Sequence, residues 1–115
     1  MEIPITEDQL TAQLFKWWDS TYPQYRGLLF HVPNGGERRG WEANKFKAMG
    51  VWAGVSDFIL LWKGCCFCIE LKLPKGSQSE AQEYWQYMVE SEGFMYVIIR
   101  DIESFKKLIW SIIGK

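Results

Sequence analysis

Two acidic residues, Asp57 and Glu70, lie at the open end of a predicted β-hairpin. Asp57 directly precedes the first predicted strand, and Glu70 lies near the end of the second. Residues 58–62 and 65–71 are rich in β-forming side chains, and Lys63-Gly64 separates them at the spacing of a two-residue turn. Residues that pair across such a turn have residue numbers with the same sum as the two turn residues. The numbers of Asp57 and Glu70 have the same sum as those of Lys63 and Gly64. The register therefore predicts that the two carboxylates face each other, with Cβ atoms roughly 4.5–5.5 Å apart.

Facing carboxylates require something that relieves their repulsion. Two full charges about 5 Å apart repel by roughly 3 kcal/mol at an effective dielectric constant near 20. A raised pKa or a bound hard cation would relieve it, because such cations prefer oxygen ligands. Lys72 lies two residues beyond Glu70 and shares its face of the strand. An Asp, a Glu and a Lys on one patch could support metal-assisted attack on a phosphodiester, although an ordinary ion cluster on a solvated hairpin has the same spacing.

A third carboxylate, Glu7, lies in the first turn of a predicted helix that runs to about Trp18. Thr6 and Gln9 have the spacing of a capping box at its start. Glu7 falls near the middle of the apolar stripe of this helix, so it is either aimed at the site or a first-turn acid with its carboxylate in solvent. The stripe consists of Leu10, Leu14, Trp17 and Trp18.

Basic residues gather between residues 37 and 49 and recur in the predicted loop after Lys72. Such a surface could contact DNA phosphates without reading base sequence, although a solvated loop with a short helix has the same composition. The candidate DNA-binding residues are Arg38, Arg39, Lys45, Lys47 and Lys75.

A second capping box, Ser79 to Gln82, opens a helix that should end near Gly93. Gln82 lies in its first turn, near the strand ends that carry the candidate site, and serves either the site or only the cap. The residues predicted to pack against the sheet are Ala81, Tyr84, Trp85, Met88 and Val89.

Length and composition favour one domain, residues 1–115, with 48% hydrophobic residues to form its core. Neither a membrane-length apolar run nor a signal-peptide pattern is present, so we expect a cytoplasmic protein that is not secreted and has no membrane partner. The three cysteines crowd one strand, which favours neither a disulfide framework nor a zinc site. A net charge of −1 does not by itself indicate nucleic-acid binding.

The predicted element order is helix, strand, short helix, two hairpin strands, helix, strand, helix. The first strand is expected over residues 27–32, the last strand over 94–99 and the last helix over 102–113. The helix between the third and fourth strands makes them parallel if they are neighbours in one sheet. The fold class is therefore α/β, with a mixed sheet that combines an antiparallel hairpin and a parallel βαβ crossover, flanked by helices.

These motifs, in this order, resemble the VRR-NUC (virus-type replication-repair nuclease) family of the PD-(D/E)xK nuclease superfamily. The resemblance runs from about Ile5 to Phe105, and the restriction-endonuclease-like core of the superfamily agrees with the predicted fold. The family usually has proline before the aspartate where this chain has Ser56, which concerns local rigidity more than metal binding. The matching segments are Val32–Gly36, Phe46–Val51, Gly54–Asp57, Ile69–Gly76 and Ser79–Gln82.

The resemblance implies an endonuclease that hydrolyses DNA phosphodiester bonds with Mg²⁺ or Mn²⁺ and no small-molecule cofactor. Asp57 and Glu70 would be metal ligands with the Leu71 carbonyl, Lys72 would serve the attacking water or the transition state, and Gln82 would contact the site. Standalone members of the family resemble phage or bacterial enzymes that act on branched DNA, such as four-way junctions or flaps. A non-catalytic DNA-binding or adaptor module is the alternative, which the intact acidic pair and lysine disfavour.

Cutting a four-way junction requires two opposed cuts, so we expect a homodimer that supplies two sites. Trp110 lies beyond the edge of the apolar stripe of the last helix. It is therefore either a lone exposed residue or an anchor of the subunit interface.

Overall fold

The computed structural model describes residues 4–33 and 40–114, whose strands form a four-stranded sheet in the order β1-β2-β3-β4. β1 (Leu29–His31) and β3 (Cys65–Leu71) run antiparallel to β2 (Phe58–Trp62), whereas β4 (Met95–Ile99) is parallel to β3. The predicted mixed sheet and α/β class are confirmed. The first strand is shorter than predicted.

The β2–β3 hairpin turns on Lys63 and Gly64, which have φ angles of 47° and 80°. Positive φ at both central residues is the geometry of a type I′ turn, which matches the twist of the flanking strands. The strands pair from Phe58 with Ile69 to Trp62 with Cys65, in the predicted register. This register fixes which residues share a face all along the hairpin.

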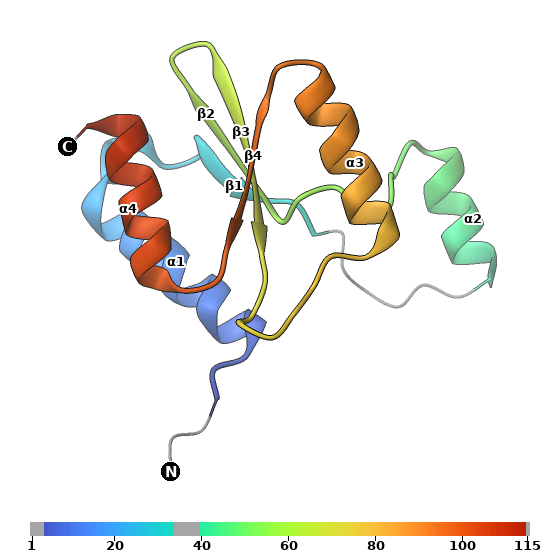
Figure 1. Ribbon diagram of the computed structural model, residues 1–115, viewed down its shortest axis with the longest axis horizontal. Coiled ribbons are helices and arrows are strands. Elements are labelled where there is room, and N and C mark those ends of the chain that lie inside the picture. The colour runs from blue at the N-terminus through green and yellow to red at the C-terminus, as the bar shows by residue number, and fades with distance from the viewer. Residues whose placement is uncertain (1–3, 34–39, 115) are drawn as a thin grey trace.

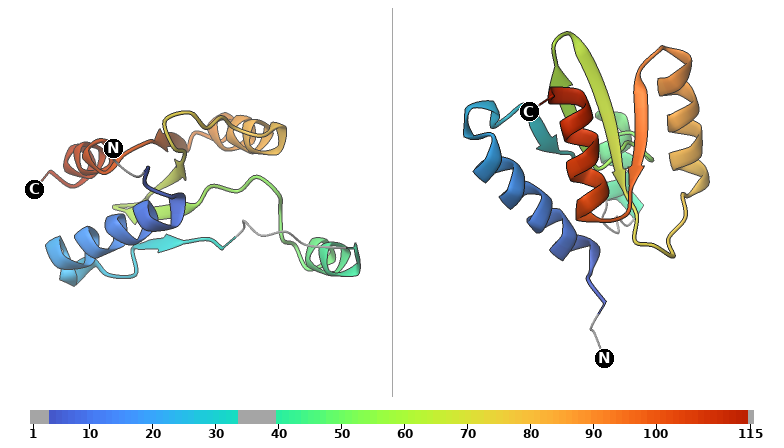
Figure 2. Two further views of the ribbon diagram at one scale, coloured as in Figure 1. Left: turned by 90° about the horizontal axis from the view of Figure 1, so that it is seen from below. Right: turned by 60° about the vertical axis from the view of Figure 1, so that its left-hand side comes forward.

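Helices cover both faces of the sheet (Figures 1 and 2). α1 (Glu7–Thr21) and α4 (Ile102–Ile113) lie on one face, and α3 (Glu80–Ser91) lies on the other. α2 (Gly40–Ala48) stands away from the sheet, at the far end from α1 and α4 (Figure 1). Among the described residues, no helix has the length and apolar character needed to cross a membrane.

The side chains of the sheet alternate between two cores. Phe58, Leu60 and Ile69 are fully buried in the larger core, beneath α1 and α4. Cys68 and Tyr96 belong to the smaller core, beneath α3. Strand alternation therefore directs the residue two positions after Cys68, which is Glu70, toward the α3 face.

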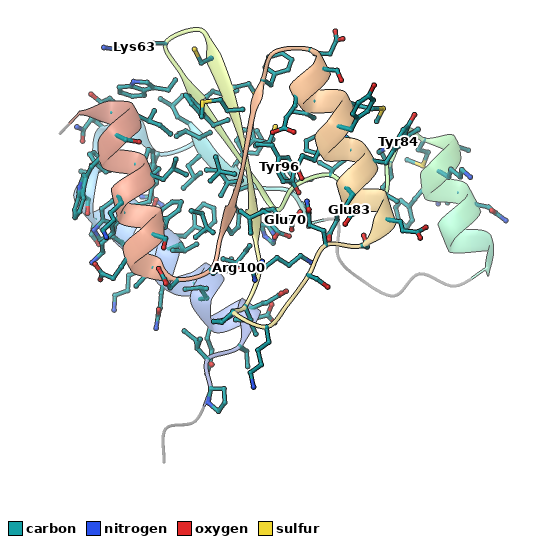
Figure 3. The ribbon with its side chains drawn as sticks, viewed as in Figure 1. Lys63, Glu70, Glu83, Tyr84, Tyr96 and Arg100 are labelled. Carbon is teal, nitrogen blue, oxygen red and sulfur yellow. The ribbon has the colours of Figure 1, made fainter. Side chains whose placement is uncertain are left out.

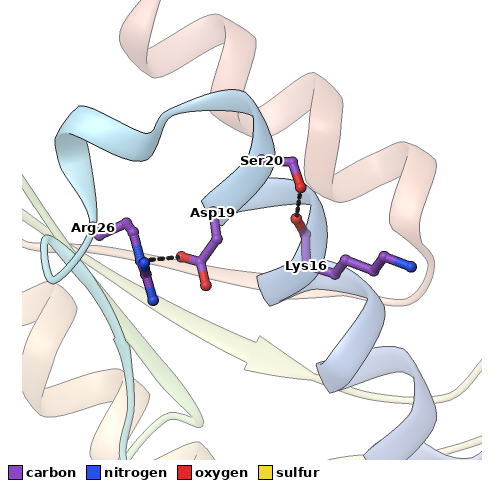
Figure 4. Close-up of polar contacts among 4 residues, drawn as sticks. All are labelled: Lys16, Asp19, Ser20 and Arg26. Atoms are coloured by element: carbon purple, nitrogen blue, oxygen red, sulfur yellow. Dashed lines mark hydrogen bonds and ion pairs between the residues drawn. The ribbon is translucent and has the colours of Figure 1, made fainter.

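α1 runs three residues further than predicted and ends before the short 3₁₀ helix η1 (Pro23–Tyr25). Near its end, the Ser20 hydroxyl donates to the Lys16 carbonyl at 2.7 Å (Figure 4). Asp19 lies 3.5 Å from the Nε of Arg26, which links the helix to the chain that enters β1 (Figure 4). This ion pair is exposed, so its net contribution to stability is at most about 1 kcal/mol.

The predicted sheet-facing stripe of α3 is wrong at Tyr84, which is 58% exposed. Val89 is buried and Trp85 packs beside it. Tyr84 lies about 140° around the helix from Val89, and a helix on a sheet does not bury so wide an arc. The outer face of α3 therefore carries Tyr84 into solvent.

The loop before β2 meets the first turn of α3 at Gly54, which has a φ of 88°. A Cβ at this position would overlap the Ala81 carbonyl oxygen and lie 2.9 Å from the Gln82 amide nitrogen. Only glycine fits such an approach of backbone to backbone. Gly54 therefore sets the distance between α3 and the segment that leads into Asp57.

We expect Gly54→Ala to lower the free energy of unfolding by about 2–4 kcal/mol, because overpacking adds to the cost of a left-handed alanine. Gly50→Ala is the matched control, since Gly50 also has a φ of 88° but has no neighbour within 4 Å of the added Cβ. Its loss should be only about 1–2 kcal/mol. Urea unfolding, followed by tryptophan fluorescence, measures the free energy of unfolding of both variants. Equal losses would show that α3 moves away from the added methyl group without an energetic cost.

Candidate active site

Asp57 lies immediately before β2, at the position opposite Glu70 in the hairpin register. Its carbonyl accepts a hydrogen bond from the Val32 amide at 2.7 Å. Its carboxylate Oδ2 accepts a hydrogen bond from the Leu71 amide at 2.8 Å. If the pairing of β2 and β3 continued beyond Phe58, Leu71 would lie opposite Ser56. The Asp57 carboxylate instead accepts the hydrogen bond of the Leu71 amide, in place of a backbone carbonyl. Asp57 is thus held through both its backbone and its side chain.

Glu70 is the sixth of the seven residues of β3 and is only 1% exposed. One of its carboxylate oxygens accepts a hydrogen bond from the Tyr96 hydroxyl at 3.2 Å, and Figure 3 shows the two side chains next to each other beneath α3. Burial, followed by the hydrogen bond and the charge of Asp57, raises the pKa of Glu70 to about 9. In the metal-free protein Glu70 is therefore protonated near neutral pH and is hydrogen-bonded to the Asp57 side chain.

Further polar side chains continue from Glu70 through Tyr96. The Gln78 amide donates to the Tyr96 hydroxyl at 3.2 Å and to the Gln86 side-chain oxygen at 2.9 Å. Sequence reasoning missed Tyr96 and Gln78. The available signal was a tyrosine within an otherwise aliphatic strand, because a buried tyrosine hydroxyl usually needs a partner.

Lys72 directly follows β3 and is partly buried. Its charge lowers the pKa of Glu70, against the larger effects of burial and Asp57, so the ammonium lies within electrostatic reach of the acidic pair. Its backbone amide donates to the Ile99 carbonyl at 3.0 Å, which ties the end of β3 to β4.

Arg100 fixes the loop that follows Lys72. Its Nη1 donates to the carbonyls of Leu73 and Gly76, both at 2.9 Å. Figure 3 shows Arg100 at the end of β4, beside this loop. One guanidinium thus fastens the chain between the lysine and the start of α3.

The structure places Gln82 in the cap of α3. Its side-chain oxygen accepts from the Ser79 amide at 2.8 Å, and its own amide donates to the Ser79 hydroxyl at 3.2 Å. The predicted capping box is therefore present, and Gly54 lies against this same turn. A contact between Gln82 and the acidic pair stays a prediction.

Glu7 is exposed in the first turn of α1, on the helix that covers the opposite face of the sheet from Glu70. Figure 1 shows that α1 begins at the end of the sheet where β3 leads into the following loop. Within the described ranges, no three His, Cys, Asp or Glu side chains lie close enough to hold a metal ion together. The structure therefore brings Asp57 and Glu70 together without Glu7.

The candidate DNA-binding lysines are all exposed. Lys45 and Lys47 lie in the last turn of α2, and Lys75 lies in the loop held by Arg100. Arg38 and Arg39 lie outside the described residues. Phosphate contact by these five residues stays a prediction.

The acidic pair has the chemistry of a site for a hard divalent cation. Its carboxylate oxygens are the ligand type that Mg²⁺ and Mn²⁺ prefer, and the Leu71 backbone adjoins both residues. Burial and the neighbouring Asp57 keep Glu70 protonated in the free protein, and the charge of Lys72 does not offset them. These residues therefore fit a divalent metal, whose binding would displace that proton.

The fold matches a solved structure described as a VRR_NUC domain protein. The TM-score is 0.79 at 26% sequence identity, and the match covers 98% of this chain and 92% of that chain. No family model matches the sequence, and no curated protein is significantly similar to it. The structural match confirms the resemblance to the VRR-NUC family and shows that the chain has a nuclease fold.

Glu70→Gln should stabilise the metal-free protein at pH 8 by roughly 2–4 kcal/mol. The pKa of Glu70 is raised from 4.5 to about 9 on folding, so between these values the folded state holds a proton that the unfolded state has lost. The stability contributed by this group is therefore complete below about pH 4.5 and is lost as pH rises toward 9. Glutamine resembles the protonated acid, because it can donate to Asp57 and accept from Tyr96.

Urea unfolding in EDTA at pH 5 and pH 8 measures this effect. The wild type should lose stability between the two values more steeply than the variant. Glu83→Gln is the control, since Glu83 is exposed on α3 and its change should leave the slope unaltered. A wild type that is more stable than Glu70→Gln at pH 8 would contradict the protonated pair.

Proposed function

Starting from the VRR-NUC fold, we propose that this protein is a divalent-metal-dependent nuclease that hydrolyses DNA phosphodiester bonds. The observation that carries the proposal is the pair of the partly buried Asp57 and the buried Glu70, which lie opposite each other in the hairpin register with Glu70 protonated. Such a pair costs stability in the free protein, as expected of a site organised for a cation rather than for folding.

Asp57 and Glu70 would hold the metal, with the Leu71 carbonyl as a further ligand by family resemblance. A bound divalent metal supplies Lewis-acid activation of a water molecule and of the phosphodiester. Glu70 would have to give up its proton for a metal to bind. The Leu71 amide keeps the Asp57 carboxylate in place throughout.

Lys72 is proposed to stabilise the negative charge that develops on the phosphate in the transition state. It follows Glu70 on the same face, and its effect on the Glu70 pKa supports this placement. The hydrogen bonds of Arg100 hold the loop after Lys72 in place. Lys45, Lys47 and Lys75 are proposed to contact the DNA backbone.

We propose branched DNA as the substrate and a homodimer as the active form. Two opposed cuts in a four-way junction need two sites, and two-fold symmetry supplies both from one sequence. Trp110 remains 47% exposed and packs edge-on against Trp17, with ring centroids 6.2 Å apart. It is therefore a supported aromatic surface residue, which suits an interface anchor better than an isolated side chain would.

Asp57→Asn should abolish cleavage, because it removes a charged ligand while keeping the size of the side chain. The test is a gel with Mg²⁺, Mn²⁺ or EDTA against single strands, duplex, flaps, splayed arms and four-way junctions. Cleavage should require metal and favour the branched forms. Asp19→Asn is the control, since Asp19 lies near the end of α1 and forms an exposed ion pair with Arg26. Metal-independent DNA binding without cleavage would instead identify a non-catalytic module.

Lys72→Ala should lower turnover by about 100-fold or more and DNA affinity by only a few-fold. A lysine that acts on developing charge contributes in the transition state, whereas a phosphate clamp contributes equally to both states. Single-turnover cleavage and fluorescence anisotropy in Ca²⁺ separate the two, and Lys75→Ala serves as the neighbouring lysine control. Equal losses in rate and affinity would make Lys72 an ordinary phosphate contact.

A further inference from the structure

The Tyr96 hydroxyl is the donor that directs the Glu70 carboxylate. Tyr96 is 8% exposed and Glu70 1%, and their hydrogen bond joins Tyr96 Oη to Glu70 Oε2 at 3.2 Å. β3 and β4 are parallel here, with Cys68 opposite Tyr96. The two side chains therefore meet diagonally within the closed layer beneath α3, where water does not compete for the bond.

The direction of this bond is fixed from the far side. Gln78 Nε2 donates to Tyr96 Oη at 3.2 Å and to Gln86 Oε1 at 2.9 Å. Because the Tyr96 oxygen accepts from Gln78, its single proton is left to donate to Glu70. Gln86 in turn orients the Gln78 amide from the second turn of α3. Gln78 therefore donates in two directions, to Gln86 on α3 and to Tyr96, and Tyr96 passes the donor direction on to the candidate metal ligand.

A carboxylate held in this way presents its two oxygens unequally. Oε2 accepts from Tyr96 on the β4 side, which occupies one of its lone pairs and fixes the orientation of the carboxylate. Calcium takes six to eight oxygen ligands and often binds carboxylates through both oxygens, whereas magnesium requires about six ligands in a near-octahedral arrangement. A carboxylate already hydrogen-bonded at Oε2 favours cation binding through its other oxygen, and one-oxygen ligation suits the smaller ion.

We propose, on the basis of the proposed metal-dependent function, that Tyr96 is a positioning residue which restricts Glu70 to one-oxygen ligation and thereby selects Mg²⁺ over Ca²⁺. Tyr96 touches neither the metal nor the substrate in this role. It acts through Glu70, and Gln78 and Gln86 keep its hydroxyl in the productive direction.

Tyr96→Phe tests the proposal, because it removes the hydroxyl and keeps the ring that packs edge-on against Trp85, with centroids 6.0 Å apart. The probe is the metal alone, MgCl₂ or CaCl₂, titrated into metal-free protein by calorimetry. The Mg²⁺ affinity should fall about 10-fold, as for other groups that orient a metal ligand. The Ca²⁺ affinity should hold or rise, so the ratio of the two affinities should change by 10-fold or more. A change in the proton affinity of Glu70 alters both affinities equally, so the ratio reports geometry.

Two further variants accompany this test. Tyr87→Phe removes a hydroxyl from an exposed tyrosine of α3 and should leave the ratio unchanged. Gln78→Ala releases the Tyr96 hydroxyl without touching the strands and should move the ratio in the same direction by a smaller factor. It also provides the test if Tyr96→Phe does not fold.

The outcomes separate this inference from the proposed function. Equal losses for both ions, or an unchanged ratio, would overturn the role of Tyr96 while leaving metal-dependent cleavage intact. A wild type that binds neither ion would overturn both. A wild type that binds metal and shows the shifted ratio, yet cleaves no DNA, would overturn only the nuclease proposal.

Discussion

The structure depends on the opposition of two carboxyl groups in a place with little access to water. Asp57 and Glu70 are brought together by the hairpin register, and Glu70 is buried beneath α3 while Asp57 is partly buried. Burial, followed by the hydrogen bond and the charge of Asp57, raises the pKa of Glu70 to about 9, so a proton on Glu70 relieves the repulsion near neutral pH. Three neighbours interact with this pair. The Leu71 amide donates a hydrogen bond to the Asp57 carboxylate, and the Tyr96 hydroxyl donates one to Glu70. Lys72 supplies the nearby positive charge.

The hairpin could be predicted from sequence because its geometry is local. Once the turn is placed at Lys63-Gly64, the constant sum of paired residue numbers fixes the whole register, including the pair of acids. Both capping boxes and the start of α4 at Asp101 are local as well, and the structure contains all three. The Tyr96 contact is different, because it joins residues 26 positions apart through a parallel pairing whose register no turn dictates. Periodicity alone also could not define the edge of the buried face of α3, and it placed Tyr84 on the wrong side.

Ser56 shows how a departure from a family pattern can be compensated. A proline before the aspartate would restrict the backbone, and its absence raised the question of rigidity. The structure buries Ser56 completely, and its hydroxyl donates to the Phe58 carbonyl at 3.1 Å. Cys68 lies near this hydroxyl, and burial raises the pKa of its thiol to about 12. A hydrogen bond across Asp57 thus takes over part of the restraint that a ring would supply, and the buried thiol beside it is chemically inert.

The contact at Gly54 has a mechanical consequence for the site. Backbone meets backbone there, so no side chain can rotate to absorb a displacement of α3. Asp57 follows three residues later and is tied to β1 and β3 by its own hydrogen bonds. Glu70 is linked to the same helix through Tyr96, Gln78 and Gln86. Both carboxylates are therefore coupled to one helix, whose outer face carries Tyr84 and Tyr87 into solvent. A displacement of α3 would therefore change the distance between the two acids. The position of this helix thus sets the geometry of the pair.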